Sequence, residues 1–139
     1  MTRKFLTPIS IDQINFNTSG ANFTPQIGSV YWNAHEGTLN VALENDVTLQ
    51  VGQETHIRVI NKTASTILNE SIVVYNGADA VTGHPTIAKF IADGSMSSEN
   101  VLGMATQDFA SNAEGYVTKF GLVHDLDTSA WTGGTVLYA

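Results

Sequence analysis

The sequence predicts an all-β protein, an antiparallel β-sandwich or a small barrel, that carries an extended N-terminal arm. Short β-prone runs recur about every ten residues after residue 28, and Gly, Asn and Asp lie between them. Apolar and polar residues alternate within several of these runs, which is the pattern of a strand with one buried face. The best helical candidate, residues 100–111, contains Gly103 and Thr106, which lower helix propensity, so a strand is favoured there.

Residues 1–28 are the expected arm, and residues 29–139 are the expected β domain. The arm is polar, rich in Asn, Thr and Ser, and holds Pro8 and Pro25, two of the three prolines in the chain. Its apolar residues show no sustained helical face, which favours an extended segment. They are Phe5, Leu6, Ile9, Ile11, Ile14, Phe16 and Phe23. Two interpretations stay open: a segment that orders against another subunit, or a flexible or cloned N-terminus.

The β domain begins with a predicted hairpin. Residues 30–32 are β-prone, residues 33–37 contain a glycine and form the turn, and residues 39–41 alternate apolar with polar side chains. Residues 47–51 alternate strictly, which predicts a half-buried strand with one apolar face. Gly52 ends that strand.

Three further stretches in the middle of the chain carry strand or turn signals. Residues 57–59 belong to one alternating strand. Residues 72–75 form a β-branched run, and the Asn-Gly pair at 76–77 is a strong turn signal after it. Residues 86–91 are another candidate strand, which the Asp-Gly pair at 93–94 ends.

The last third of the chain predicts three more strands. Residues 101–106 form the first, and a polar loop at residues 111–115 follows. Residues 116–123 alternate in the next strand, and residues 135–138 form the final one.

Composition excludes several classes of function. The chain has 139 residues, which suggests one domain, and it has no cysteine, so neither disulfides nor thiolate chemistry are possible. The net charge is −7, and the bases are scattered along the chain, so nucleic acid is not an expected partner. No apolar run approaches the roughly 20 residues that cross a bilayer, and the first residues lack the apolar region of a secretory signal, so no membrane insertion is expected.

Neither a metal nor a cofactor is expected. The densest group of metal-type ligands is His124, Asp125 and Asp127, but a third nearby acid and the glycine pattern of a calcium loop are missing. A solvated turn is therefore expected there. His56 falls on the outward phase of its strand, where a polar cross-strand contact is expected.

Enzymatic catalysis is not expected either. The sequence has no nucleophile elbow, no cysteine and no glycine-rich phosphate loop. Asp93, Asp108 and Glu114 would have to form an acid–base pair of the kind that glycosidases use, and all three fall in predicted turns. No catalytic residue is therefore assigned.

Large apolar and aromatic side chains are the candidate interaction residues. Aromatic residues are enriched at protein interfaces and also stack on sugars, although many fill a β core. Trp131 lies in a loop-like stretch before Gly133-Gly134 and is the best surface candidate. The full set of candidates is Phe5, Leu6, Ile9, Phe16, Phe23, Tyr31, Trp32 and Trp131.

Several motifs resemble those of bacteriophage tail-fibre and virion appendage proteins. Residues 28–33, Gly-Ser-Val-Tyr-Trp-Asn, and residues 36–41, Glu-Gly-Thr-Leu-Asn-Val, resemble a hairpin common in those proteins. Residues 46–54, Asp-Val-Thr-Leu-Gln-Val-Gly-Gln-Glu, resemble the run that follows it. The opening residues 3–9 are similar to tail-fibre N-termini.

The second half of the same module is matched by shorter stretches. Residues 101–106, 115–118 and 121–123 resemble its strand pair, and residues 134–138 loosely match its closing strand. Relatives usually continue past that strand, whereas this chain stops at Ala139. The chain is then either the N-terminal part of a longer fibre or a short protein that another chain completes.

The resemblance implies a non-enzymatic virion structural protein that is assembled in the host cytoplasm. Its expected partners are other virion proteins of the tail or capsid and further copies of itself, with a homotrimer favoured. Two alternatives stay open. One is a capsid decoration protein that stabilises the head, and the other is a carbohydrate-binding receptor module that uses Trp131, Tyr116 and nearby acids.

Overall fold

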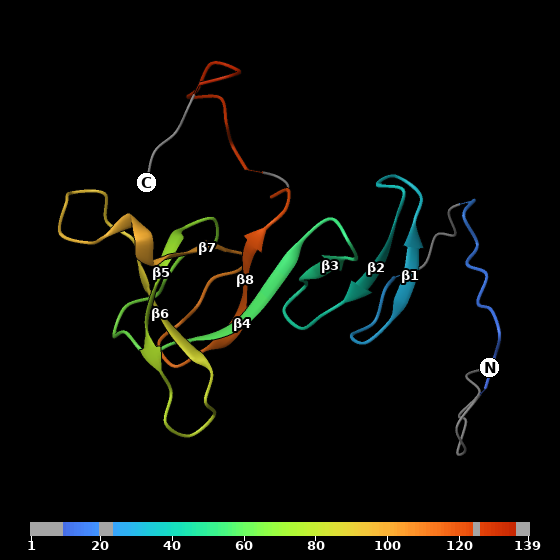
Figure 1. The fold of residues 1–139 in the computed structure, drawn as a ribbon, viewed down its shortest axis with the longest axis horizontal. Helices are drawn as coiled ribbons and strands as arrows, with labels where there is room; N and C mark the ends of the chain where they lie inside the picture. The colour runs from blue at the N-terminus through green and yellow to red at the C-terminus, as the bar shows by residue number, and fades with distance from the viewer. Residues whose placement is uncertain (1–9, 20–23, 124–125, 136–139) are drawn as a thin grey trace.

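The computed structural model describes residues 10–19, 24–123 and 126–135, and these residues are nearly all β (Figure 1). A three-stranded antiparallel sheet packs beside a five-stranded closed barrel, so the predicted all-β fold is confirmed. The strands are β1 (Val30–Asn33), β2 (Thr38–Ala42), β3 (Thr48–Gln50), β4 (Thr55–Asn61), β5 (Ile72–Ala78), β6 (Pro85–Lys89), β7 (Val101–Ala105) and β8 (Glu114–Phe120), with a 3₁₀ turn, η1 (Ser98–Asn100), before β7.

Local turn chemistry forms the three-stranded sheet. The predicted hairpin is confirmed: β1 pairs antiparallel with β2, and the carboxamide Oδ1 of Asn33 accepts the backbone N–H groups of His35 and Glu36 in the turn. Asn45 and Asp46, which both have φ of +60°, join β2 to β3 by a tight connection. Asn and Asp tolerate this left-handed backbone better than other non-glycine residues.

The barrel closes through one parallel pair of strands. Its strand order is β4-β6-β5-β7-β8, and β4 pairs antiparallel with β8 and parallel with β6. All other neighbours in the barrel are antiparallel. Residues 101–105 are a strand, as predicted, because β7 lies between β5 and β8 and both neighbours supply backbone hydrogen-bond partners.

The core lies inside the barrel. Phe109 is 0% exposed and closes it from the loop between β7 and β8, where Ile67 and Phe109 pair through two backbone hydrogen bonds. The polar side chain of Asn61 is also fully buried. The buried apolar residues are Val59, Ile67, Val73, Ile87, Ala105, Phe109 and Val117.

Two turn and strand predictions need revision. The Asn76-Gly77 pair does not end its strand, because β5 continues through it to Ala78 as a bulge, with Gly77 at φ +108°. The chain reverses one step later, where Asp79 accepts hydrogen bonds from the N–H and the hydroxyl of Thr82. Thr135 is not in a strand, and the rest of the expected strand at residues 135–138 lies outside the described residues.

The described part of the N-terminal arm contains no strand or helix. Residues 10–19 and 24–27 are irregular, and Ile11 and Ile14 are 57% and 61% exposed. Among the described residues, no helix is long and apolar enough to cross a membrane.

Candidate functional site

The three-stranded sheet buries its polar face. Directly opposed residues in antiparallel strands share a face, and one cross-strand row is Tyr31, Asn40 and Gln50. Asn40 is 2% exposed and Gln50 is 6% exposed, and Thr38 on the same face is 6% exposed. The polar face of this sheet is therefore buried at Thr38, Asn40 and Gln50, and its β3 residues Thr48 and Gln50 lie toward the barrel.

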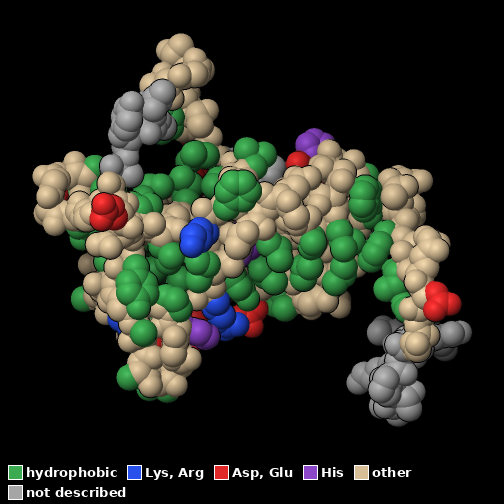
Figure 2. All heavy atoms as spheres, in the orientation of Figure 1, with side chains coloured by type: hydrophobic (Ala, Val, Ile, Leu, Met, Phe, Trp, Pro, Cys, Tyr) green, Lys and Arg blue, Asp and Glu red, His purple; other side chains and the backbone are tan. Residues whose placement is uncertain are grey.

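The opposite face of the sheet is apolar and only partly covered. It consists of two cross-strand rows, Val30–Val41–Leu49 and Trp32–Leu39. None of these five side chains is buried, and Val30 is 50% exposed. Hydrophobic side chains gather over β1, β2 and β3 on the visible side of Figure 2. We call Val30, Trp32, Leu39, Val41 and Leu49 the apolar face.

The structure separates the predicted interaction residues. Trp32 lies on the apolar face, whereas its neighbour Tyr31 lies on the polar face, because successive strand residues point to opposite sides. Phe16 is half-buried in the arm, and Trp131 is 44% exposed in the irregular segment 126–135. The remaining four candidates lie outside the described residues: Phe5, Leu6, Ile9 and Phe23.

A polar hollow of about 370 Å³ lies between the sheet and the barrel. Thr48 and Gln50 of the sheet line one side, and His56 and Thr118 of the barrel line the other. Glu54 lies at the junction, where its Oε1 accepts the backbone N–H of Gln50 at 2.6 Å. The hollow therefore forms where the polar side of β3 meets the barrel.

His56 is buried at this hollow, which corrects its predicted outward position. The side chains of His56 and Glu54 are each 6% exposed, and His56 Nε2 lies 3.4 Å from Glu54 Oε1 and 3.3 Å from the Thr48 carbonyl. Both neighbours of Nε2 are acceptors, so Nε2 carries a proton, and Nδ1 lies 3.3 Å from the Thr118 hydroxyl. Through these contacts, His56 and Glu54 connect β4 with β8 and with the three-stranded sheet.

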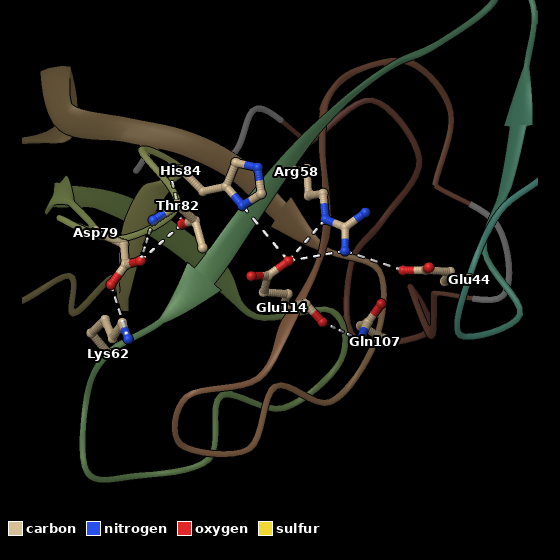
Figure 3. Close-up of polar contacts among 8 residues, drawn as sticks. All are labelled: Glu44, Arg58, Lys62, Asp79, Thr82, His84, Gln107 and Glu114. Carbon is tan, nitrogen blue, oxygen red and sulfur yellow. Dashed lines mark hydrogen bonds and ion pairs between the residues drawn. The ribbon is translucent and has the colours of Figure 1, made fainter.

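Charged residues form two groups on the outside of the barrel (Figure 3). Arg58 donates to Glu114 at 2.9 and 3.0 Å and also contacts Glu44 at 3.3 Å, so it links β4, β8 and the β2–β3 turn. The hydrogen bond with Glu114 raises the pKa of Arg58. Lys62 contacts Asp79 at 2.9 Å, and this contact, followed by the hydrogen bonds from Thr82, lowers the pKa of the Asp79 carboxyl.

The acids considered for catalysis have separate partners. Hydrogen bonds from the side chain and then from the N–H of Ser95 lower the pKa of Asp93, and Asp108 accepts the N–H of Asn69 at 2.7 Å. Glu114 is held by Arg58. Each carboxylate therefore has a local structural contact.

The predicted metal-type group lies partly outside the described residues. His124 and Asp125 are not described, and Asp127 accepts the N–H of Ser129, which lowers the pKa of the Asp127 carboxyl. The structure as described holds no group of three or more His, Cys, Asp or Glu side chains that could bind a metal ion.

Sequence reasoning missed the buried polar residues Asn40, Gln50 and Glu54. Asn40 stands out because its Oδ1 is buried without a hydrogen-bond partner among the described residues. The alternating pattern marked Asn40 and Gln50 as one face, but gave no sign that this face is covered. The signal in the sequence that could have indicated this burial was the row of polar residues Tyr31, Asn40 and Gln50 at matching positions of three consecutive strands.

Comparison of the chain with protein-family models, curated proteins and solved structures found no match.

Proposed function

We propose that this chain is a structural protein of a bacteriophage particle, a tail-fibre or appendage component that assembles with copies of itself and with another virion protein. The motif run at residues 28–54 supports this proposal, and in the structure that run contains all three strands of the small sheet. The second stretch of the resemblance, residues 101–123, contains β7 and β8. The proposed role is mechanical attachment and assembly, without catalysis.

The observation that carries the proposal is the apolar face. A soluble sheet with one open side normally buries its apolar side chains and exposes its polar ones. Here Asn40 and Gln50 are buried, whereas Val30 is 50% exposed and Trp32 is only half-buried. A contiguous apolar surface of this kind is typical of a protein–protein contact. Trp32 is the type of residue that dominates such contacts.

The proposal is tested by the solution mass of the full chain, measured by light scattering over a range of concentrations. We expect a trimer for the wild type. Val30→Asp places a charge at an exposed point of the apolar face and should give a monomer, because burying an unpaired carboxylate is costly. Val81→Asp is the matched control, since Val81 is 91% exposed in the β5–β6 loop. A wild-type monomer at every concentration would contradict self-assembly.

The tail or capsid location is decided by a separate measurement. A capsid decoration protein would share the fold, the charge and the apolar face of a fibre protein. It would copurify with empty heads that lack tails, whereas an appendage protein would be found on tailed particles only. Copurification with tailless heads would replace the tail assignment with the decoration role.

A second candidate function, carbohydrate binding, is favoured by the exposure of Trp131. Its side chain is 44% exposed, and an exposed indole is suited to stacking on a sugar ring. A glycan array with the wild type and with Trp131→Ala tests this role. Loss of signal only in the variant supports it, and equal signals remove this tryptophan from the argument.

A further inference from the structure

Strand β1 is an open edge of the three-stranded sheet. The strand order is β1-β2-β3, so β1 has a strand neighbour on one side among the described residues. Native edge strands are usually protected by charges, proline or a bulge. The β1 sequence, Val-Tyr-Trp-Asn, has no charged residue and no proline, and its register with β2 is regular from Val30 to Asn33, after a bulge at Gly28 and Ser29. This edge therefore has the properties of a strand that accepts another strand.

The alternation of backbone hydrogen bonds between β1 and β2 shows which residues of β1 direct their N–H and C=O groups to the open edge. Ala42 accepts the N–H of Gly28 at 2.8 Å and donates its own N–H to the Ser29 carbonyl at 2.9 Å, so Gly28 and Ser29 form a bulge that takes the place of one hydrogen-bonded pair with β2. Such pairs alternate along an antiparallel ladder with pairs whose backbone groups point away. Val30 and Trp32 are in that second phase, so their N–H and C=O groups point to the open edge. Their side chains belong to the apolar face.

The arm supplies a segment with the complementary pattern. Residues 10–19 are described but are not in any strand or helix, and Ile14 is 61% exposed. In an extended chain, Ile14 and Phe16 project to one side, and Asn15 and Asn17 project to the other. Added beside β1, this segment would extend the apolar face with Ile14 and Phe16. Its asparagines would extend the polar face.

Charge favours the same pairing between two copies of the chain. Each copy carries a net charge of −7, so most pairs of surfaces repel one another. Residues 10–19 contain one acid, Asp12, and β1 contains none, so these are charge-poor surfaces that can meet.

We propose that residues 10–19 of one copy add as a fourth strand to the β1 edge of a neighbouring copy. The inference rests on the proposed self-assembly and names the contact that produces it. Main-chain hydrogen bonds from Val30 and Trp32 provide the pairing, and Ile14 and Phe16 cover part of the apolar face. Strand addition of this kind combines backbone pairing with side-chain specificity at alternate positions.

Two single-cysteine chains test the exchange, because the native chain has no cysteine. One full-length chain carries Ile14→Cys and a mass tag, and the other carries Val30→Cys. They are mixed, left to equilibrate and treated with a short bis-maleimide. The matched control replaces Val30→Cys by Val81→Cys, which places the thiol in an exposed loop. Light scattering of the same samples reports the assembly state before cross-linking.

We expect the tagged Ile14→Cys chain to link to Val30→Cys at least about tenfold more than to Val81→Cys, because pairing raises the effective thiol concentration. A trimer by light scattering without this link would overturn the arm exchange and leave self-assembly intact. A monomer would overturn both. A chain with both Ile14→Cys and Val30→Cys that links only internally would show that the arm pairs with its own sheet, which also overturns the exchange.

Discussion

Replacing either of the two buried asparagines in the described structure by valine should change stability, and in opposite directions. Asn40 is 2% exposed, and its Oδ1 has no hydrogen-bond partner within the part of the chain that the structure describes. Asn61 is 0% exposed and fully bonded. The two variants delete the same side chain from a buried strand position, so the difference between them isolates hydrogen bonding.

For Asn40→Val we expect a gain in the free energy of unfolding. A buried polar group without a partner costs about 1–3 kcal/mol, and valine removes that cost. Valine also has a higher β propensity than asparagine, on a scale that spans about 1 kcal/mol. Asn40 lies in the central strand β2, between Tyr31 and Gln50, where this propensity applies. The expected gain is about 1–3 kcal/mol.

For Asn61→Val we expect a large loss. Its Nδ2 donates to the carbonyls of Ser65, Phe109 and Ala110, and its Oδ1 accepts the N–H and hydroxyl of Thr63. Each carbonyl keeps another donor, such as Ile67 N–H for Phe109, so none is left unpaired. The two Nδ2 hydrogens are shared by three carbonyls, so the side chain makes about four full hydrogen bonds. At a net value of about 0.5–1.5 kcal/mol each, the expected loss is about 2–6 kcal/mol.

Urea unfolding at one fixed protein concentration measures both variants. At a typical slope of about 2 kcal/mol per molar urea, the midpoint should rise by about 0.5–1.5 M for Asn40→Val and fall by about 1–3 M for Asn61→Val. The concentration is fixed because the proposed self-assembly would stabilise the folded chain. Equal destabilisation by the two substitutions would refute the reasoning, since it would show that the Asn40 carboxamide is bonded as well as that of Asn61.

Two further predictions concern the barrel. Gly103→Ala should prevent β7 from pairing with β8, because a Cβ at this position would lie 2.1 Å from the Thr118 carbonyl oxygen. The midpoint of thermal unfolding should therefore fall strongly. The control Gly133→Ala, at a position with open space around it, should leave the midpoint unchanged. Asp79→Asn should flatten the acid limb of the stability profile. The contact with Lys62 lowers the pKa of Asp79 in the folded state. The contribution of the ionised Asp79 to the free energy of unfolding is therefore present above the ordinary carboxyl pKa of about 3.9 and is lost as the pH falls further. An acid limb that Asp79→Asn leaves unchanged would contradict this.

Strand positions followed from the sequence because alternation and turn chemistry are local. The hairpin of β1 and β2 was predicted from its two β-prone runs and the glycine between them, and Gly37 in that turn has φ of +65°. The Asn76-Gly77 prediction failed for a related reason. The same dihedral angles serve a turn or a bulge, and pairing with β6 on both sides of Gly77 selected the bulge.

The candidate site was predicted only in part. Trp32 was correctly placed in a strand, and Trp131 at the surface. The burial of Glu54 and His56 was not predicted, because both residues occupy polar positions of the pattern. Their burial depends on two strands: β3, which lies on the other side of the hollow, and β8, which is far from them in sequence.

By itself, the sequence determined the β class, most strand positions and the division of each strand into two chemical faces, since all three depend on residues a few positions apart. The tertiary structure decided which face is covered. It buried Asn40 and Gln50, left Val30 exposed and Trp32 half-buried on the opposite face, and closed the barrel through the parallel β4–β6 pair. Periodicity defines a face without orienting it, because orientation depends on the element packed against the strand, and residues distant in the chain supply that element.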